Sequence, residues 1–228
     1  MAGTLSPRLS TAIGFALAIG GGIVLRFDQL SSQLLLDDEW HAVYRVVHDT
    51  PAAVFRDFGH SDSSIPLTLL YYLESHAFGL SEIAMRWPLL VAGIATLVFF
   101  PWYVARRIGH GEALVFAALL AISPLLYFFS RMARPYALTL FLAYVAHVAF
   151  RRYVDAHVPK RSDAAVYATS AALAAWLHPV VVPFVVAPFV PATWHWLRAL
   201  PAQRGPAFVR LTVLALAAGI PMAALLGP

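Results

Sequence analysis

Residues 9–27 read LSTAIGFALAIGGGIVLRF, an apolar run interrupted by one charge, Arg26, near its end. About 20 apolar residues in a helix cross the hydrocarbon core of a bilayer, so this run is long enough to span a membrane. The apolar stretch is long for a signal peptide, and no small-residue cleavage site follows it. The run therefore predicts an uncleaved first transmembrane helix.

The composition of the rest of the chain agrees with this start. Apolar residues make up 60% of the 228 residues and charged residues 12%, against about 45–50% and about 25% in soluble domains. Such numbers exclude disorder and a long coiled coil, and the absence of cysteine excludes a disulfide-stapled module. We expect an all-α polytopic membrane protein forming a single transmembrane module over residues 1–228.

Six further apolar runs follow the first, which predicts about seven transmembrane helices. They are Trp87–Val104, Ala113–Ser130, Tyr136–Phe150, Ala164–Leu177, Val180–Trp196 and Leu211–Leu226. Ala164–Trp196 could instead be one long span broken at His178-Pro179, but we favour two helices that turn there. A single span would place Arg198, Arg204 and Arg210 outside and remove the charge bias described next.

The basic residues predict the orientation of the chain. With a cytoplasmic N-terminus and seven alternating spans, ten Lys and Arg lie inside and six lie outside, which follows the positive-inside rule. The inner residues are Arg8, Arg106, Arg107, Arg151, Arg152, Lys160, Arg161, Arg198, Arg204 and Arg210; the outer ones are Arg26, Arg45, Arg56, Arg86, Arg131 and Arg134. The net charge of +4 is therefore interpreted as a topology signal and not as a sign of nucleic-acid binding.

The first outer loop, about residues 28–86, contains a polar stretch with short helical patterns. Asp37 is expected to cap a helix whose first turn carries Asp38 and Glu39. An apolar stripe formed by Trp40, Val43, Tyr44 and Val47 is typical of a helix lying in the membrane interface. Thr50-Pro51 predicts the start of a second short helix, and Ser64-Ile65-Pro66 that of a third, over residues 66–78.

This helical pattern predicts that three acids, Asp37, Asp38 and Glu39, lie just outside the first span. They are either a solvated helix start or the site of a general base near a lipid headgroup. A metal site that recruits His41 or His48 is a third alternative, although the spacing matches no closed set of metal ligands.

A second polar cluster, Ser130-Arg131-Met132-Ala133-Arg134-Pro135-Tyr136, follows the third apolar run. Arginines on the side where positive charge is disfavoured need a partner. They could snorkel to lipid phosphates, or they could bind a phosphate through bidentate guanidinium contacts. We expect Pro135 to end the helix and to leave this turn exposed.

An ordered set of motifs resembles the membrane glycosyltransferases of the C-type (GT-C) fold, over roughly residues 9–190. Within this fold, the chain resembles the bacterial relatives of protein O-mannosyltransferases and of the aminoarabinose transferase that modifies lipid A. The motifs are the acid pair Asp38-Glu39, His60 through Leu67, Leu70–Leu73, Gly79–Glu82, Ala84–Pro88, Ser123–Tyr127 and Ser130–Leu138.

The resemblance implies an enzyme of the bacterial inner membrane that moves a sugar from a polyprenyl-phosphate donor to an acceptor on the outer face. It gives Asp38, with Glu39 beside it, the role of the base or of the residue that positions the acceptor. It also matches Arg131, Arg134 and Tyr136 to a motif that we expect to bind the donor phosphate. Asp37, His60 and His178 are further candidates for the acceptor cavity. No cofactor is expected, and a divalent metal is not required because the arginines can offset the phosphate charge. The chain corresponds to the common core of this family, which suggests the N-terminal part of a longer protein.

Two other classes of function stay open. A flippase for a lipid-linked sugar would use the same arginines, although transporters tend to show repeats and polar residues at mid-span, which are not evident here. A non-catalytic scaffold is the other alternative, because Ser63-Ser64-Ile65-Pro66-Leu67 stands where the family usually has His-Pro-Pro-Leu-Tyr.

Overall fold

The computed structural model describes residues 6–57 and 64–227, and every regular element among them is a helix. The prediction of an all-α chain is thereby confirmed for the described residues. Contacts divide the chain into two compact units, which are described separately. Unit 1 comprises Met1–Trp40 and Leu73–Ala137, and unit 2 comprises His41–Tyr72 and Leu138–Pro228.

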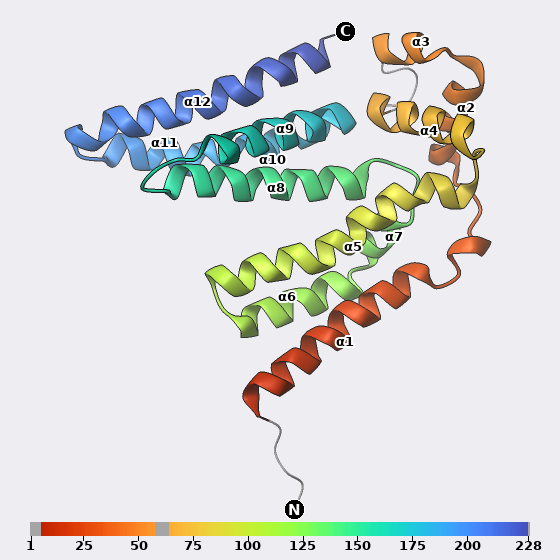
Figure 1. Cartoon of the computed structure of the whole chain (residues 1–228), viewed down its shortest axis with the longest axis horizontal. Coiled ribbons are helices and arrows are strands. Elements are labelled where there is room, and N and C mark those ends of the chain that lie inside the picture. Colours follow the sequence, from red (N-terminus) through yellow and green to blue (C-terminus); the bar gives the residue numbers. More distant parts are fainter. Residues whose placement is uncertain (1–5, 58–63, 228) are drawn as a thin grey trace, which may run out of the picture. The chain divides into compact units, whose positions relative to one another are not determined.

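Unit 1 is a small bundle built on the first predicted span (Figure 1). Its elements are α1 (Pro7–Phe27), η1 (Leu30–Ser32), α5 (Glu82–Arg107), α6 (His110–Ile122) and α7 (Pro124–Ser130). Helix α1 packs on α6, and α5 packs on both α6 and α7. The helices approach closely at glycines: a Cβ on Gly93 of α5 would lie 2.3 Å from the Cβ of Ser130, so only glycine fits at this contact.

The prediction of one continuous span over Ala113–Ser130 is wrong. The structure divides this run into α6 and α7, and the two helices are bent by 60° relative to each other. The cause lies at Ser123-Pro124. Pro124 has no N–H to donate to the carbonyl of Leu120, and the Ser123 hydroxyl accepts a bond from the N–H of Leu126 at 3.4 Å, which starts a new helix.

The carbonyl that Pro124 leaves without a helical donor is satisfied by a distant side chain. Arg26 of α1 donates through Nη2 to the Leu120 oxygen at 3.3 Å and through Nη1 to the Gly22 oxygen at 2.9 Å. Its side chain is buried. Arg26, the one charged residue in the first apolar run, therefore supplies the hydrogen bond that is missing at the break between α6 and α7.

Three short helices occupy the predicted outer loop: α2 (Asp37–His48), α3 (Pro51–Arg56) and α4 (Ile65–Ala77). The Thr50 hydroxyl caps α3 by accepting from the N–H of Ala53 at 3.3 Å, as the cap-then-proline pattern predicted. Helix α4 begins and ends one residue before the predicted bounds. Trp40, Tyr44 and Val47 are each more than half exposed, while Val43 is partly buried. Three of the four residues of the apolar stripe of α2 therefore face outward, as expected of an interfacial helix.

Unit 2 contains the later helices. They are α8 (Tyr136–Asp155, of which residues 138–155 belong to this unit), α9 (Arg161–Leu177), η3 (Pro179–Val181), α10 (Val182–Val186), α11 (Phe189–Arg198) and α12 (Pro201–Leu226). Its core is rich in alanine, with Phe150, Tyr167 and Leu214 among the larger buried side chains.

The chain reverses its direction at His178-Pro179. The ring of Tyr167 in α9 lies 6.2 Å from that of Phe189 in α11, and its hydroxyl donates to the Val185 oxygen at 3.0 Å. Residues on either side of the turn can meet in this way only if the two segments are antiparallel. The structure therefore supports two helices over residues 164–196 and not one long span.

Four helical segments are long and apolar enough to cross a membrane: Arg8–Ser32, Glu82–Arg107, Pro179–Arg198 and Pro201–Leu226. The bent pair α6–α7 would make a fifth if it acts as one span. All seven predicted runs are helical, but α8 and α9 do not pass the same test, α9 having 17 residues. Several helices long and apolar enough to cross a membrane support a polytopic membrane protein, and the number of seven spans stays a prediction.

Candidate functional site

The acid segment predicted to carry the chemistry lies at the start of α2, in unit 1. The structure gives Asp38 and Glu39 opposite environments: Asp38 is exposed, whereas Glu39 is fully buried. Glu39 occupies the third position of the helix and its Oε2 accepts from the N–H of Leu36 at 2.7 Å. This is the Glu half of a capping box, which satisfies a backbone donor at the helix start.

Glu39 also forms a buried ion pair with Arg86 of α5. Arg86 Nη2 lies 3.3 Å from Glu39 Oε2, and both side chains have no solvent exposure. The same guanidinium donates to the backbone oxygens of Gln33 at 2.5 Å and Leu34 at 2.9 Å. Arg86 therefore links α5 to the segment that precedes α2 by hydrogen bonds to Gln33 and Leu34.

A third element meets Glu39, the turn 131–135 that follows α7. The N–H of Ala133 donates to Glu39 Oε1 at 2.5 Å, and Arg134 Nη1 donates to the backbone oxygen of Asp38 at 3.4 Å. The two polar clusters that the sequence analysis singled out, 94 residues apart at Glu39 and Ala133, are thus joined directly.

The turn is buried, which corrects the expectation that Pro135 exposes it. Helix α7 already ends at Ser130, and residues 131–135 are all buried. Arg131 is 6% exposed and Arg134 is 8% exposed. The physical reason is that Glu39 accepts a bond from the turn backbone and draws it against α2 and α5.

Aromatic rings cover both arginines of the turn. The Arg131 guanidinium lies 4.7 Å from the centre of the Tyr127 ring, and that of Arg134 lies 5.9 Å from the Tyr136 ring. Tyr136 in turn packs against Phe129, with ring centres 4.7 Å apart. The predicted site residue Tyr136 therefore orients one of the arginines through a cation–π contact.

The arginines of the turn carry positive charge that no ion pair among the described residues neutralises. Neither Arg131 nor Arg134 forms an ion pair with a carboxylate in the described part of the chain, and the Nε of each is buried without a hydrogen-bond partner. Burial lowers the pKa of Arg131; nearby Asp28 opposes this shift, and nearby Arg86 adds to it. A guanidinium stays charged in proteins, so this region favours an anion.

The remaining predicted candidates are Asp37, His60 and His178. The side chain of Asp37 and all of His60 lie outside the described residues. His178 belongs to unit 2, where it stands half-buried between α9 and η3. Within residues 6–57 and 64–227, no group of three His, Asp or Glu could hold a metal ion.

Two buried charged residues of unit 1 were not predicted to be buried. Arg86 was counted only as an outer arginine within the motif Ala84–Pro88, although a charge flanked by Met85 and Trp87 in an apolar helix signals a buried partner. Glu74 of α4 is 8% exposed, its Oε2 has no hydrogen-bond partner among the described residues, and burial raises its pKa.

Comparison with known proteins does not place the chain in a class: no protein family, no curated protein and no solved structure matches it.

Proposed function

We propose that this chain is a membrane glycosyltransferase that moves a sugar from a polyprenyl-phosphate donor to an acceptor on the outer face of a bacterial inner membrane. The observation that supports it best is the pair of contacts joining α2 to the turn 131–135, Glu39 with Ala133 and Asp38 with Arg134. They bring an exposed carboxylate to the edge of a region that favours an anion. A base beside a phosphate site is what glycosyl transfer from a lipid phosphate requires.

Asp38 is the base in the proposed reaction. The oxygen of the acceptor hydroxyl attacks the anomeric carbon of the sugar as the Asp38 carboxylate takes the hydroxyl proton. The bond between the anomeric carbon and the phosphate oxygen breaks on the opposite face, and the polyprenyl phosphate leaves with that electron pair. The configuration at the anomeric carbon inverts.

Arg131 and Arg134 bind the donor phosphate and offset the charge that develops on it as the bond breaks. Both guanidiniums are buried, so their attraction for the phosphate is screened less than it would be at an exposed site. Their positions are fixed by Tyr127 and Tyr136 before any substrate binds, which limits the reorganisation needed in the transition state.

Glu39 is assigned a positioning role, although the resemblance pairs it with the base. Its carboxylate is fully buried and is engaged by Leu36, Arg86 and Ala133. It therefore sets the distance between the base and the phosphate site without contacting the acceptor.

The proposed topology has seven spans, a cytoplasmic N-terminus, and the site of Asp38 and Arg131 on the outer side. The bias of ten inner against six outer basic residues supports this orientation.

Transfer in liposomes tests the base. The chain, its Asp38→Asn variant and the control Glu82→Gln, another acid of the outer loop, are reconstituted with sugar-labelled polyprenyl-phosphate mannose and a hydroxyl acceptor. Removing a general base typically costs 10²- to 10⁴-fold in rate, so Asp38→Asn should lose at least about 100-fold while Glu82→Gln retains transfer. Equal rates for all three would remove Asp38 from the mechanism. Movement of intact donor without transfer would indicate a flippase, and neither activity would indicate a scaffold.

Binding of polyprenyl phosphate without a sugar tests the arginines separately. Arg131→Gln and Arg134→Gln should each weaken binding by about tenfold, since a hydrogen bond to a charged group contributes about 1.5–3 kcal/mol. Arg56→Gln, at an exposed arginine of the outer loop, is the matched control. Unchanged affinity in the double variant, with helicity intact by circular dichroism, would contradict the phosphate site.

A further inference from the structure

Unit 2 concentrates positive charge at one end of its helices. Residues 151–210 contain seven Lys and Arg but two Asp, Asp155 and Asp163. The connection between α8 and α9 and the connection between α11 and α12 lie at the same end of this unit (Figure 1). The cations gather around these two connections, far along the chain from the site proposed above.

A cavity of about 800 Å³ opens between the end of α8 and the α11–α12 connection. Its lining includes Arg151, Arg198, Arg210, His157 and His195, and its one acid is Asp155. Asp155 pairs with Arg151 at 3.0 Å. Among the described residues neither Arg198 nor Arg210 pairs with a carboxylate, so the cavity carries a net positive charge.

The wall of the cavity is fixed by Arg210. Its guanidinium donates to the backbone oxygens of Val154 at 2.9 Å, Ala156 at 2.7 Å and His157 at 3.1 Å. Val154 belongs to the last turn of α8, and Ala156 and His157 follow its end, where basic side chains are favoured. Arg210 thus joins α12 to α8 and gives the cavity a defined shape, while Arg198 is exposed.

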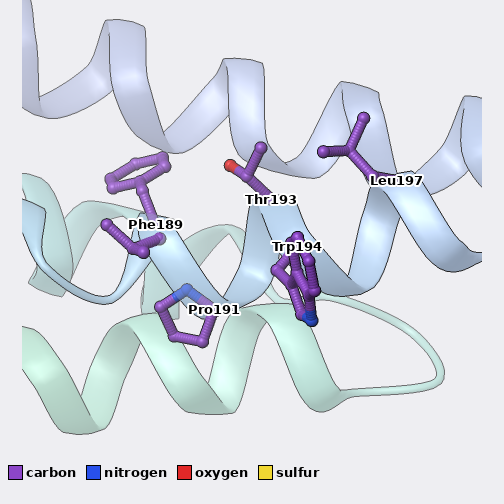
Figure 2. A pocket seen from close by; sticks show the side chains of 6 residues that line it. Phe189, Pro191, Thr193, Trp194 and Leu197 are labelled. Carbon is purple, nitrogen blue, oxygen red and sulfur yellow. The ribbon is translucent and has the colours of Figure 1, made fainter.

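An apolar groove of about 620 Å³ runs along α11 beside this cavity. Figure 2 shows the side chains of Phe189, Pro191, Thr193, Trp194 and Leu197 following one another along the helix. The Arg198 guanidinium, which lines the basic cavity, lies 4.1 Å from the centre of the Trp194 ring, which lines the groove. The apolar groove and the basic cavity therefore meet at Arg198.

We propose that this paired cavity and groove is a binding site for an anionic phospholipid. The phosphate of the headgroup occupies the basic cavity beside Arg198 and Arg210, and an acyl chain follows Trp194 and Phe189 along α11. Basic pockets between membrane helices are suited to anionic headgroups. The adjoining apolar groove favours a lipid over a soluble phosphate, because an inorganic ion would leave that groove uncovered.

Native mass spectrometry of the 228-residue chain in detergent tests the site, with phosphatidylglycerol and phosphatidylcholine as probes. Phosphatidylglycerol should be retained preferentially. Arg198→Gln should weaken its binding by about fivefold, since each cation near an anionic membrane surface contributes on this scale. The matched control is Arg106→Gln, whose guanidinium lies 4.3 Å from the Trp102 ring at an exposed helix end outside the cavity; it should bind as the parent does.

A second variant reduces the volume of the basic cavity and leaves its arginines unchanged. Ala202 lines the cavity in the first turn of α12, so Ala202→Trp should reduce phosphatidylglycerol binding while every arginine remains. Equal binding of the two lipids, equal losses in Arg198→Gln and Arg106→Gln, or full binding by Ala202→Trp would each overturn the proposal. Displacement of the lipid by millimolar inorganic phosphate would also overturn it, by showing a site for the free ion. No sugar donor is present, so the result is independent of the proposed transferase activity.

Discussion

Asp38 and Glu39 are neighbours in the sequence, but the fold separates their physical roles. Glu39 is buried in an ion pair with Arg86, whereas Asp38 is exposed on the same helical turn. A buried pair is costly to break, because its removal on one side leaves an uncompensated charge. The two residues should therefore respond very differently to substitution.

Glu39→Ala is expected to lower the free energy of unfolding by about 3–5 kcal/mol, since Arg86 would remain buried without its carboxylate. Asp38→Ala, at the exposed neighbour, should change it by no more than about 0.5 kcal/mol. Chemical unfolding in detergent micelles measures both values. The double variant Glu39→Ala/Arg86→Met should be less destabilised than Glu39→Ala alone. Similar effects of Glu39→Ala and Asp38→Ala would contradict a structural role for the pair.

Glu74 provides a prediction about pH. Burial raises its pKa above the ordinary value, so the folded state binds the proton more tightly than the unfolded chain does. The parent should lose stability as pH rises from the ordinary carboxyl pKa, about 4.3, through the raised folded value. Glu74→Gln should then have the higher melting temperature at pH 7 and no advantage at pH 4. The same difference between parent and variant at both pH values would refute this linkage.

At the scale of elements, the break between α6 and α7 depends on a residue of α1. Pro124 removes the helical donor for the Leu120 carbonyl, and Arg26 supplies another. Arg26 lies inside a predicted span, and its role is to donate to the Leu120 carbonyl, 94 residues away in the sequence, which lacks its helical hydrogen bond. The glycine contact of Gly93 with Ser130 keeps α7 close to α5 at the same place.

Arg26→Met should cost about 1–3 kcal/mol of unfolding free energy, because it leaves the buried Leu120 carbonyl without a donor. In a Pro124→Ala background the new backbone N–H can reach that carbonyl, so the cost of Arg26→Met should be smaller. A double-mutant cycle on thermal or chemical unfolding gives the coupling directly. If Arg26→Met costs the same in both backgrounds, the hydrogen bond to Leu120 is not what stabilises the break.

For the whole molecule, the proposed orientation can be tested with cysteine labelling, because the chain contains no native cysteine. Phe78→Cys and Val158→Cys replace side chains that are 72% and 80% exposed, in the proposed outer loop and on the proposed inner side. A membrane-impermeant maleimide should label Phe78→Cys in intact cells, and Val158→Cys only after permeabilisation. Labelling of both from outside, or the reverse pattern, would contradict the proposed topology.

Local patterns were sufficient to predict most helices. Apolar runs placed the long helices, Thr50-Pro51 placed α3, and Pro66 placed α4 to within one residue. The turn at His178-Pro179 was also predicted, because a single long span conflicted with the distribution of basic residues. The break at Ser123-Pro124 was missed, since the apolar run continues through it and hydropathy does not register a lost hydrogen bond.

Length, apolar periodicity and helix caps are local properties, so the sequence predicts the helices of the described residues and their capacity to cross a membrane. Which polar groups meet depends on how the helices pack. The ion pair of Glu39 with Arg86 and the contact of Glu39 with Ala133 join residues 47 and 94 positions apart, and Arg131 is buried beside them only in the folded chain. Such partners are chosen by the packing of helices and by the need to satisfy each buried charge, and no local pattern specifies them.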